Sequence, residues 1–367
     1  MSADTQSATS ENAPLFIVGC GRSGTTLLRL MLSAHSALAI PEESHFIYQL
    51  ARKRAAGFYR GGLEHPACWE RLLQFFHNHE FINRWRIDMS MLMHRLHALP
   101  DRNYRDVFET VFDSYREREG KSIWGDKTPM HANYMLLVRH FFPNARFIHI
   151  VRDGREVALS LMTRKWGPRH ISHAGYYWKW LVLAGMSGGH AIGPDNYRQI
   201  RFEDLVRDPH SVLQALCHWL QLEFEPAILD YHKTIAAQDY AAHGEKARQL
   251  GQPLDTSKLD RWKTAMSVTY QESVLKQAGG LLAHLGYEAP AINRSQQVDR
   301  ARIEELLRQP PTSLLPTSSQ PMVHGQTAEI RLLGMRARQA LQFARGDYTA
   351  WTTTGMRWQQ SVASLMH

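Results

Sequence analysis

The chain has 367 residues, enough for one large domain with a substantial core and for appendages to it. Hydrophobic residues make up 44% and charged residues 21% of the sequence, which is ordinary for a globular protein and excludes wholesale disorder. The formal net charge of +8 favours anionic partners, but no lysine-rich block with interleaved aromatic residues indicates nucleic-acid binding.

Residues 1–13 predict a flexible N-terminal tail. This stretch is small and polar with acidic residues, which is not typical of a signal or transit peptide. No apolar run in the sequence has the length that a transmembrane segment needs. The three cysteines are too few and too scattered for a disulfide framework. Together these features predict a cytoplasmic protein.

A strand, a glycine-rich turn and a helix are predicted in succession after the tail. Leu15–Val18 is an apolar run typical of a buried parallel strand, and Thr25 begins a helical pattern. Gly19, Gly21 and Gly24 allow a tight turn between them. Because free backbone N–H groups and the positive end of the helix dipole converge there, the turn predicts an anion-binding site. A plain strand-to-helix turn is the alternative.

The turn departs from the familiar triphosphate-binding loop. That signature has Lys and then Ser or Thr directly after the last glycine, whereas Thr25 follows Gly24 here and the cation is Arg22. A triphosphatase would place the lysine on the β- and γ-phosphates and would hold magnesium with an acid. The turn is therefore a poor site for a nucleoside triphosphate and still a good site for another anion.

A second short strand is predicted over residues 37–40, and Pro41 ends it. Glu42 and Glu43 therefore follow the carboxyl end of a strand, which is where open α/β sheets place their ligands. These acids are either catalytic or ordinary acidic residues at a helix N-terminus, and the motif taken alone favours the second interpretation.

A helical insertion is predicted over residues 49–121, because apolar and aromatic residues recur there at helical spacing. It is either a lid or acceptor-binding wall, or simple packing. A short strand at residues 123–124 follows, with a turn expected over residues 125–129 and a helix over residues 131–142. Lys127 in that turn is either within reach of a phosphate at the same sheet edge or an ordinary surface lysine.

Another buried strand is predicted over Phe147–Val151, followed by a helix over Glu156–Met162 that carries Ser160. Arg152 lies where the strand ends and the helix begins, and its planar guanidinium suits a bidentate grip on phosphate. The alternative is that Arg152 pairs with Asp153 and caps the helix.

The rest of the domain again alternates between helices and strands. A long helix near Trp178 is rich in Tyr and Trp, which indicates either an apolar acceptor site or core packing. The elements predicted after it are a strand over 197–202, a polar turn over 203–208, a helix over 209–220 and a loop over 236–256. Arg261 and Lys263 then flank Trp262.

This alternation predicts an α/β fold, with a P-loop-like parallel β-sheet flanked by helices, in a domain over residues 14–290. The composition shifts after it, and residues 291–367 predict a helical C-terminal extension with a Pro- and Ser-rich linker over residues 309–321. The extension is expected to pack on the domain or on a partner, for example in a homo-oligomer. A basic helix lying on an anionic membrane is the alternative.

Several segments, taken in order, resemble the sulfotransferases that use 3′-phosphoadenylyl sulfate. They are LFIVGCGRSGTTLLRLML, PEESH, DKTP, FPNARFIHIVRDGREVALS, IRFEDLVRDP and LDRWK with LGYE. The resemblance covers residues 14–288 and is strongest toward the protein-tyrosine and bacterial members of the family. It implies that the nucleotide is a co-substrate with two separate anchoring sites.

The resemblance implies which residues hold this donor. The residues that match are, for the 5′-phosphosulfate, Arg22, Ser23, Gly24, Thr25 and Thr26, and, for the 3′-phosphate, Arg152 and Ser160. A 3′-phosphate needs its own cationic grip, which separates this donor from ATP. Arg261 and Lys263 are expected to add a further contact to the 3′-phosphate.

The resemblance also implies catalytic roles. Glu43 matches the general base that takes the proton of an acceptor hydroxyl, and Lys127 matches the lysine that stabilises charge on the leaving phosphate. His45 is a rival for the base, since other family members use a histidine, and Glu42 is a weaker rival. The implied reaction is a direct, metal-free displacement, with the sulfate donor nucleotide and an unidentified hydroxyl acceptor as partners.

Two other functions stay open at this point. One is a kinase-like phosphotransferase that uses ATP, against which Thr25 in the lysine position argues. The other is a catalytically silent protein that binds nucleotides or polyanions, against which the intact motifs around Glu43 and Lys127 argue.

Overall fold

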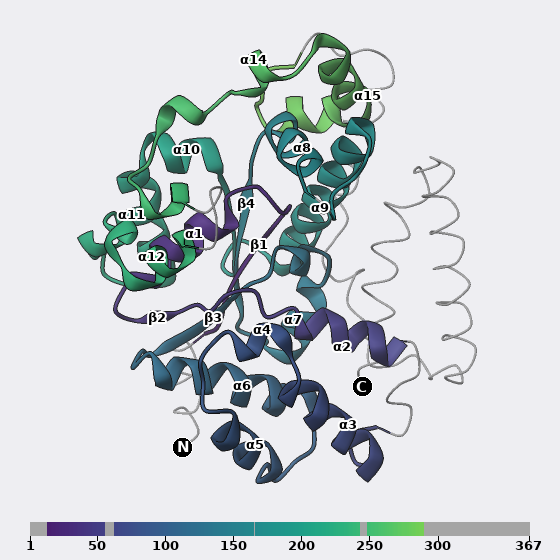
Figure 1. Cartoon of the computed structure of the whole chain (residues 1–367), viewed down its shortest axis with the longest axis vertical. Coiled ribbons are helices and arrows are strands. Elements are labelled where there is room, and N and C mark those ends of the chain that lie inside the picture. Colours follow the sequence, from purple (N-terminus) through teal and green to yellow (C-terminus); the bar gives the residue numbers. More distant parts are fainter. Residues whose placement is uncertain (1–12, 56–61, 165, 243–247, 290–367) are drawn as a thin grey trace, which may run out of the picture.

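The computed structural model of the chain describes residues 13–55, 62–164, 166–242 and 248–289 (Figure 1). The predicted N-terminal tail, apart from residue 13, lies outside these residues. So does the predicted extension over residues 291–367 with its linker, and the oligomer contact assigned to that extension stays a prediction.

The described residues form one sheet of five parallel strands in the order β2-β3-β1-β4-β5. The strands are β1 (Leu15–Gly19), β2 (Leu38–Ala39), β3 (Ile123–Lys127), β4 (Arg146–Val151) and β5 (Tyr197–Arg201). β1 is central, with Phe16 opposite Asp126 of β3 and Phe147 of β4. The predicted α/β fold with a parallel sheet is confirmed.

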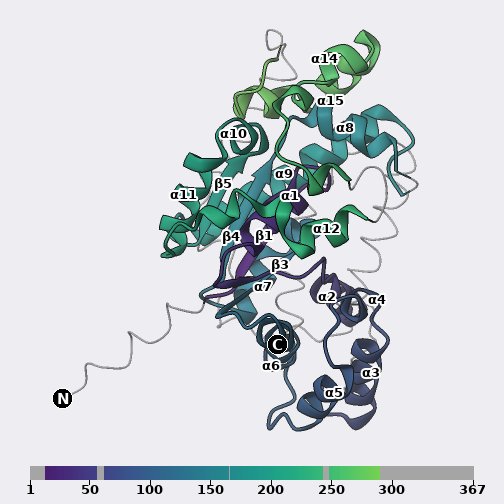
Figure 2. The ribbon, with the colours of Figure 1, turned by 60° about the vertical axis from the view of Figure 1, so that its left-hand side comes forward.

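Helices cover both faces of this sheet (Figures 1 and 2). Side chains alternate along β1, so Leu15 and Ile17 enter one apolar core while Phe16 and Val18 enter the other. The helices on the Leu15 side are α1 (Thr25–Ser33), α10 (Phe202–Arg207), α11 (Pro209–Leu220) and α12 (Ile235–Ala241). Those on the Phe16 side are α7 (Met135–Phe141), α8 (Gly154–Met162), α9 (Ile171–Ile192), α14 (Trp262–Ala265) and α15 (Val268–His284).

The predicted helical insertion is present and forms the lower part of the molecule in Figure 1. Its helices are α2 (Phe46–Ala55), α3 (Pro66–His77), α4 (Glu80–Asn83), α5 (Met89–His97) and α6 (Tyr104–Arg118). Phe112 of α6 stacks on Trp124 of β3, with ring centroids 4.4 Å apart and planes 3° apart. This contact ties the insertion to the core of the sheet.

Two of the predicted turns are wrong. β3 continues through Lys127, so the chain does not turn away at residues 125–129. Gly125 makes this possible, because a Cβ there would lie 2.8 Å from the carbonyl oxygen of Leu15 on the neighbouring strand. The predicted polar turn over residues 203–208 is helix α10, which forms because Leu205 and Val206 are buried on one side of it.

Two further predictions hold only in part. The helix expected over residues 131–142 is split into a 3₁₀ helix, η1 (Pro129–Asn133), and α7, because Tyr134 leaves the helical region at φ −131°. The loop expected over residues 236–256 contains most of α12. The remaining 3₁₀ segments are η2 (Pro226–Ile228), η3 (Tyr231–Lys233), η4 (Gln249–Gly251) and η5 (Thr256–Lys258).

Candidate active site

The glycine-rich turn between β1 and α1 has the geometry of an anion cradle. Gly24 precedes α1 in the left-handed region at φ +95°, and a Cβ on it would lie 2.2 Å from the Phe202 ring, so both conformation and space require glycine. Within the described part of the chain no side chain caps the first turn of α1, which begins at the buried Thr25. The buried hydroxyl of Ser23 has no hydrogen-bond partner among the residues described. A bound anion would satisfy these donors.

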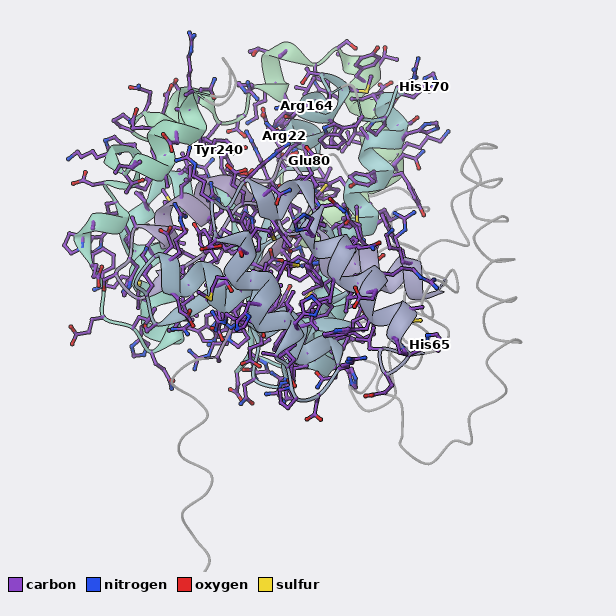
Figure 3. The ribbon with its side chains drawn as sticks, turned by 60° about the horizontal axis from the view of Figure 1, so that its bottom comes forward. Arg22, His65, Glu80, Arg164, His170 and Tyr240 are labelled. Carbon is purple, nitrogen blue, oxygen red and sulfur yellow. The ribbon has the colours of Figure 1, made fainter. Side chains whose placement is uncertain are left out.

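Arg22 of this turn connects it to the second predicted site. Its Nε donates a hydrogen bond of 3.0 Å to the Ser160 hydroxyl of α8, so segments far apart in the sequence meet. Arg22, Arg164 and Tyr240 lie in the same region of the molecule (Figure 3). Burial lowers the pKa of Arg22, and the positive charge of Arg164 lowers it further. Gathering such cations is unfavourable unless an anion joins them.

Arg152 lies at the end of β4, in the place predicted for the 3′-phosphate. Its guanidinium packs over the ring of Phe202 at 4.3 Å, and its Nη2 donates to Glu156 at 3.1 Å. Its buried Nε has no partner in the described ranges. Trp178 of α9 donates from Nε1 to the Arg152 carbonyl at 2.9 Å and so fixes the backbone. Burial lowers the pKa of Arg152, although Glu156 opposes that change.

The alternative in which Arg152 pairs with Asp153 is wrong. Asp153 accepts from the backbone N–H of Arg155 at 2.8 Å, which caps α8, and its carboxylate pairs with the Arg155 guanidinium at 2.6 Å. Arg155 therefore has the structural role, and the Arg152 guanidinium does not take part in the cap. The Arg155 guanidinium also lies over the ring of Trp262, 3.4 Å from its centroid.

Glu156 is a site residue that the sequence did not reveal. This carboxylate is 2% exposed and accepts from Arg152, from Arg261 at 3.2 Å and from the backbone N–H of Trp262 at 2.7 Å. Glu156 places Arg261 beside Arg152, where the resemblance predicts that Arg261 adds a further contact to the 3′-phosphate. Lys263 instead pairs with Glu288 at 3.1 Å. The available signal was an acid four residues after Arg152 on a predicted helix.

Glu43 and Lys127 meet at the mouth of the anion cradle. Lys127 Nζ lies 2.7 Å from Glu43 Oε1 and 3.4 Å from the Thr26 hydroxyl of α1. The Lys127 side chain is 3% exposed and that of Glu43 is 33% exposed, so the carboxylate remains accessible to a second substrate. The sequence predicts both residues for catalysis, and the structure brings them together.

The two rivals for the base differ in position. His45 Nε2 lies 2.8 Å from Glu43 Oε2, and its Nδ1 lies 3.1 Å from the Tyr48 hydroxyl. Burial raises the pKa of Tyr115 on α6 to about 12, and the charge of Glu42 adds to this rise. His45 is therefore a direct partner of Glu43, whereas the charge of Glu42 contributes to the electrostatics of Tyr115 on α6.

The Glu43 carboxylate is strongly held in its ionised form. Burial alone would raise its pKa, but the charge of Lys127 and the hydrogen bond with His45 outweigh burial and hold the pKa of Glu43 well below its usual range. The Glu43 carboxylate therefore binds a proton weakly as long as Lys127 and His45 remain in contact with it.

Aromatic side chains pack against His45, the partner of Glu43. The rings of His45 and Phe81 lie 4.2 Å apart, and Tyr48 contacts His45 edge-on at 5.6 Å. Burial raises the pKa of Tyr177 on α9, and the charge of Glu43 is among the smaller contributions to this rise. Trp178 of α9 is a packing residue, since it is 0% exposed.

The comparisons with known proteins identify the family of this chain. A family model described as "Sulfotransferase family" matches residues 14–226, more than half of the chain. The chain belongs to the sulfotransferase family. The family match confirms the resemblance in the sequence and the class of enzyme, a sulfotransferase.

Relatives of this sulfotransferase are distant. Protein-tyrosine sulfotransferase A of Caenorhabditis elegans is 23% identical over 291 residues, which cover 76% of this chain and 68% of that protein. Nodulation protein NoeE of Sinorhizobium fredii is 24% identical over 299 residues, which cover 74% and 65% of the two chains. An uncharacterized protein of Aquifex aeolicus is 24% identical, and the match spans 30% of its length.

A solved structure supports the fold. The sulfotransferase domain from the Synechococcus PCC 7002 olefin synthase matches with a TM-score of 0.51 at 24% identity, over 78% of this chain and 100% of that domain. No helix within the described residues is long and apolar enough to cross a membrane. No three His, Cys, Asp or Glu side chains in that part of the chain are grouped so as to hold a metal ion.

Proposed function

We propose that this sulfotransferase moves a sulfuryl group from 3′-phosphoadenylyl sulfate to an acceptor hydroxyl, with Glu43 as the general base. The observation that carries the proposal is the 2.7 Å contact between Glu43 and Lys127 beside Thr26, at the start of α1. A base, a cation and an anion cradle then converge on one reacting group.

The residues around the two cation sites fit this donor. The Ser23 hydroxyl and the free N–H groups of the turn would hold the 5′-phosphosulfate, together with Arg22 and Thr26. Arg152 and Ser160 would hold the 3′-phosphate, and Arg261 lies beside Arg152 through their shared carboxylate. The proposed 5′-phosphosulfate and 3′-phosphate sites are adjacent, because Arg22 of the first donates a hydrogen bond to Ser160 of the second.

The proposed reaction is a single displacement. The acceptor oxygen forms a bond to sulfur while the bond from sulfur to the bridging phosphate oxygen breaks. Glu43 takes the acceptor proton, and Lys127 stabilises the negative charge that develops on the leaving phosphate. The products are a sulfate ester and adenosine 3′,5′-bisphosphate. Within such a scheme a general base typically contributes about 10²–10⁴-fold to the rate.

The low pKa of Glu43 has a role in this scheme. As Lys127 turns toward the charge on the leaving oxygen, Glu43 loses the cation that most strongly lowers its pKa. Its affinity for a proton then rises as the acceptor proton is released. The same lysine thus keeps the base ionised before the reaction and strengthens it during the reaction.

The acceptor is assigned only as a hydroxyl. The relatives named protein-tyrosine sulfotransferases have a phenolic acceptor by name, and the rings of Tyr48 and Phe81, which pack against His45 beside Glu43, are compatible with an apolar or aromatic one. Metal-free chemistry and a cytoplasmic location stay predictions.

The test is calorimetric titration of the protein with adenosine 3′,5′-bisphosphate, AMP and ATP, each with and without magnesium. We expect tight binding of the bisphosphate that is independent of magnesium, and much weaker binding of AMP, because Arg152 and Ser160 recognise the 3′-phosphate. Equal or tighter binding of ATP with magnesium would overturn the proposal and favour the kinase alternative. Polyanion binding with steep salt dependence and no preference for the bisphosphate would favour the silent binding protein.

A further inference from the structure

Two buried polar side chains flank Lys127 and have no role in the mechanism above. Asp126 and Thr128 are both 0% exposed. The chain stays extended through Thr128, which has φ −122° and ψ 103°. Successive side chains of an extended chain point to opposite sides. Asp126 and Thr128 therefore face one way, and Lys127 faces the other way toward Glu43.

The Thr128 hydroxyl binds the segment that carries Glu43. It accepts hydrogen bonds from the backbone N–H of Ser44 at 3.0 Å and of His45 at 3.3 Å, and it donates to Asp126 Oδ1 at 3.1 Å. The Ser44 hydroxyl also lies 3.2 Å from the Thr128 hydroxyl, which therefore contacts this segment at two backbone N–H groups and one side chain. Because Ser44 directly follows Glu43, the Thr128 hydroxyl anchors the backbone next to the base.

His45 needs this anchor. Its backbone lies in the left-handed region at φ +58°, which is uncommon for a residue other than glycine. Such a conformation persists where the surrounding contacts hold it. In this conformation the His45 ring reaches Glu43 at 2.8 Å. Loss of the Thr128 hydroxyl would remove a backbone partner of His45 and free the segment to relax.

Asp126 lies directly against His131 of η1. Asp126 Oδ2 lies 2.7 Å from His131 Nδ1, and His131 is also 0% exposed. The His131 ring contacts the ring of Tyr48 edge-on at 6.0 Å, and the Tyr48 hydroxyl lies 3.1 Å from His45 Nδ1. Thr128 thus contacts the backbone of His45, and His131 supports the His45 side chain through Tyr48.

We propose that Thr128, oriented by Asp126, is a positioning residue that fixes Glu43 against Lys127 for sulfuryl transfer. The end of β3 then has two roles. Lys127 acts on the leaving group, and Thr128, on the opposite side of the chain, sets the distance between Glu43 and Lys127. The inference rests on the proposed role of Glu43.

The test compares Thr128→Val, which keeps the branched shape and removes the hydroxyl, with Thr128→Ser, which keeps the hydroxyl. The rate measured is the formation of adenosine 3′,5′-bisphosphate from 3′-phosphoadenylyl sulfate with water as the acceptor. We expect the valine variant to lower this rate about 10- to 100-fold, as a small displacement of a catalytic group does, while bisphosphate affinity changes less than about twofold. The serine variant should keep most of the rate.

Thr110→Val is the matched control. The Thr110 hydroxyl donates to the Asp106 carbonyl at 2.7 Å within α6, so the same chemical group is lost away from the site. This control should leave the rate unchanged. A valine variant of Thr128 with the wild-type rate would overturn the inference. So would a loss of rate that serine does not restore, or an equal loss of bisphosphate affinity, since either would indicate a general structural role.

A second measurement does not depend on turnover. The ¹³C carboxyl signal of Glu43, assigned by its loss in Glu43→Gln, can be followed from pH 7 downward. We expect it to titrate at a higher pH in Thr128→Val than in the wild type, because the carboxylate separates from Lys127 and His45. An unchanged titration would contradict the positioning role. If the wild-type protein does not bind the bisphosphate at all, the proposed function fails instead.

Discussion

Replacing Arg152 by alanine tests the most specific part of the donor site. Among the described residues the buried Nε of Arg152 has no hydrogen-bond partner, while its Nη2 donates to Glu156, and the proposed function assigns this side chain to the 3′-phosphate. A hydrogen bond to a charged group contributes about 1.5–3 kcal/mol, and 1.4 kcal/mol is tenfold in affinity. Arg152→Ala should therefore weaken adenosine 3′,5′-bisphosphate about 10- to 150-fold. AMP, which lacks the 3′-phosphate, should change less than about threefold.

The fold is expected to survive this substitution. Glu156 keeps Arg261 and the Trp262 N–H as partners, so no buried charge is left without a hydrogen bond. Arg198→Ala is the control, because Arg198 is exposed on β5 and its guanidinium binds the Pro194 carbonyl at 2.9 Å. Calorimetry with both nucleotides gives the result. An equal loss for AMP and the bisphosphate, or no loss for either, would refute the assignment of Arg152 to the 3′-phosphate.

Three further predictions concern the base, the cradle and the core. Glu43→Gln should lower turnover about 10²–10⁴-fold and keep bisphosphate binding, while Glu42→Gln keeps both; a turnover that stays normal in the first variant contradicts the base assignment. Gly24→Ala should abolish bisphosphate binding and lower the melting temperature, because the new Cβ meets Phe202 at 2.2 Å; unchanged binding would show that the cradle is not the donor site. Burial lowers the pKa of His149 to about 3, so the unfolded chain binds a proton that the folded protein does not, and stability falls as the pH drops from about 6.5 toward 3. In denaturant unfolding between pH 7 and pH 5, His149→Gln should lose up to about 1.4 kcal/mol per pH unit of this dependence, and an unchanged slope would contradict the burial of a neutral imidazole.

Local patterns in the sequence were sufficient to predict a parallel sheet and the glycine-rich turn after its first strand. The apolar run before Gly19 and the strand before Arg152 are buried on both faces, so each reads as a continuous hydrophobic segment. The predictions failed where tertiary contacts overrode composition. Gly125 reads as a turn residue, yet it continues β3 because only glycine allows the close approach of β1.

The sequence, together with its resemblance to the family, predicted which residues carry the chemistry: an anion cradle with Arg22, an acid at Glu43, a lysine at Lys127 and a second cation at Arg152. Only the tertiary structure decided their partners. Hydrogen bonds from Arg22 to Ser160 and from Lys127 to Glu43 join segments 138 and 84 residues apart. No local pattern encodes such distances, because they follow from the order of the parallel strands, whose carboxyl ends meet at one edge of the sheet.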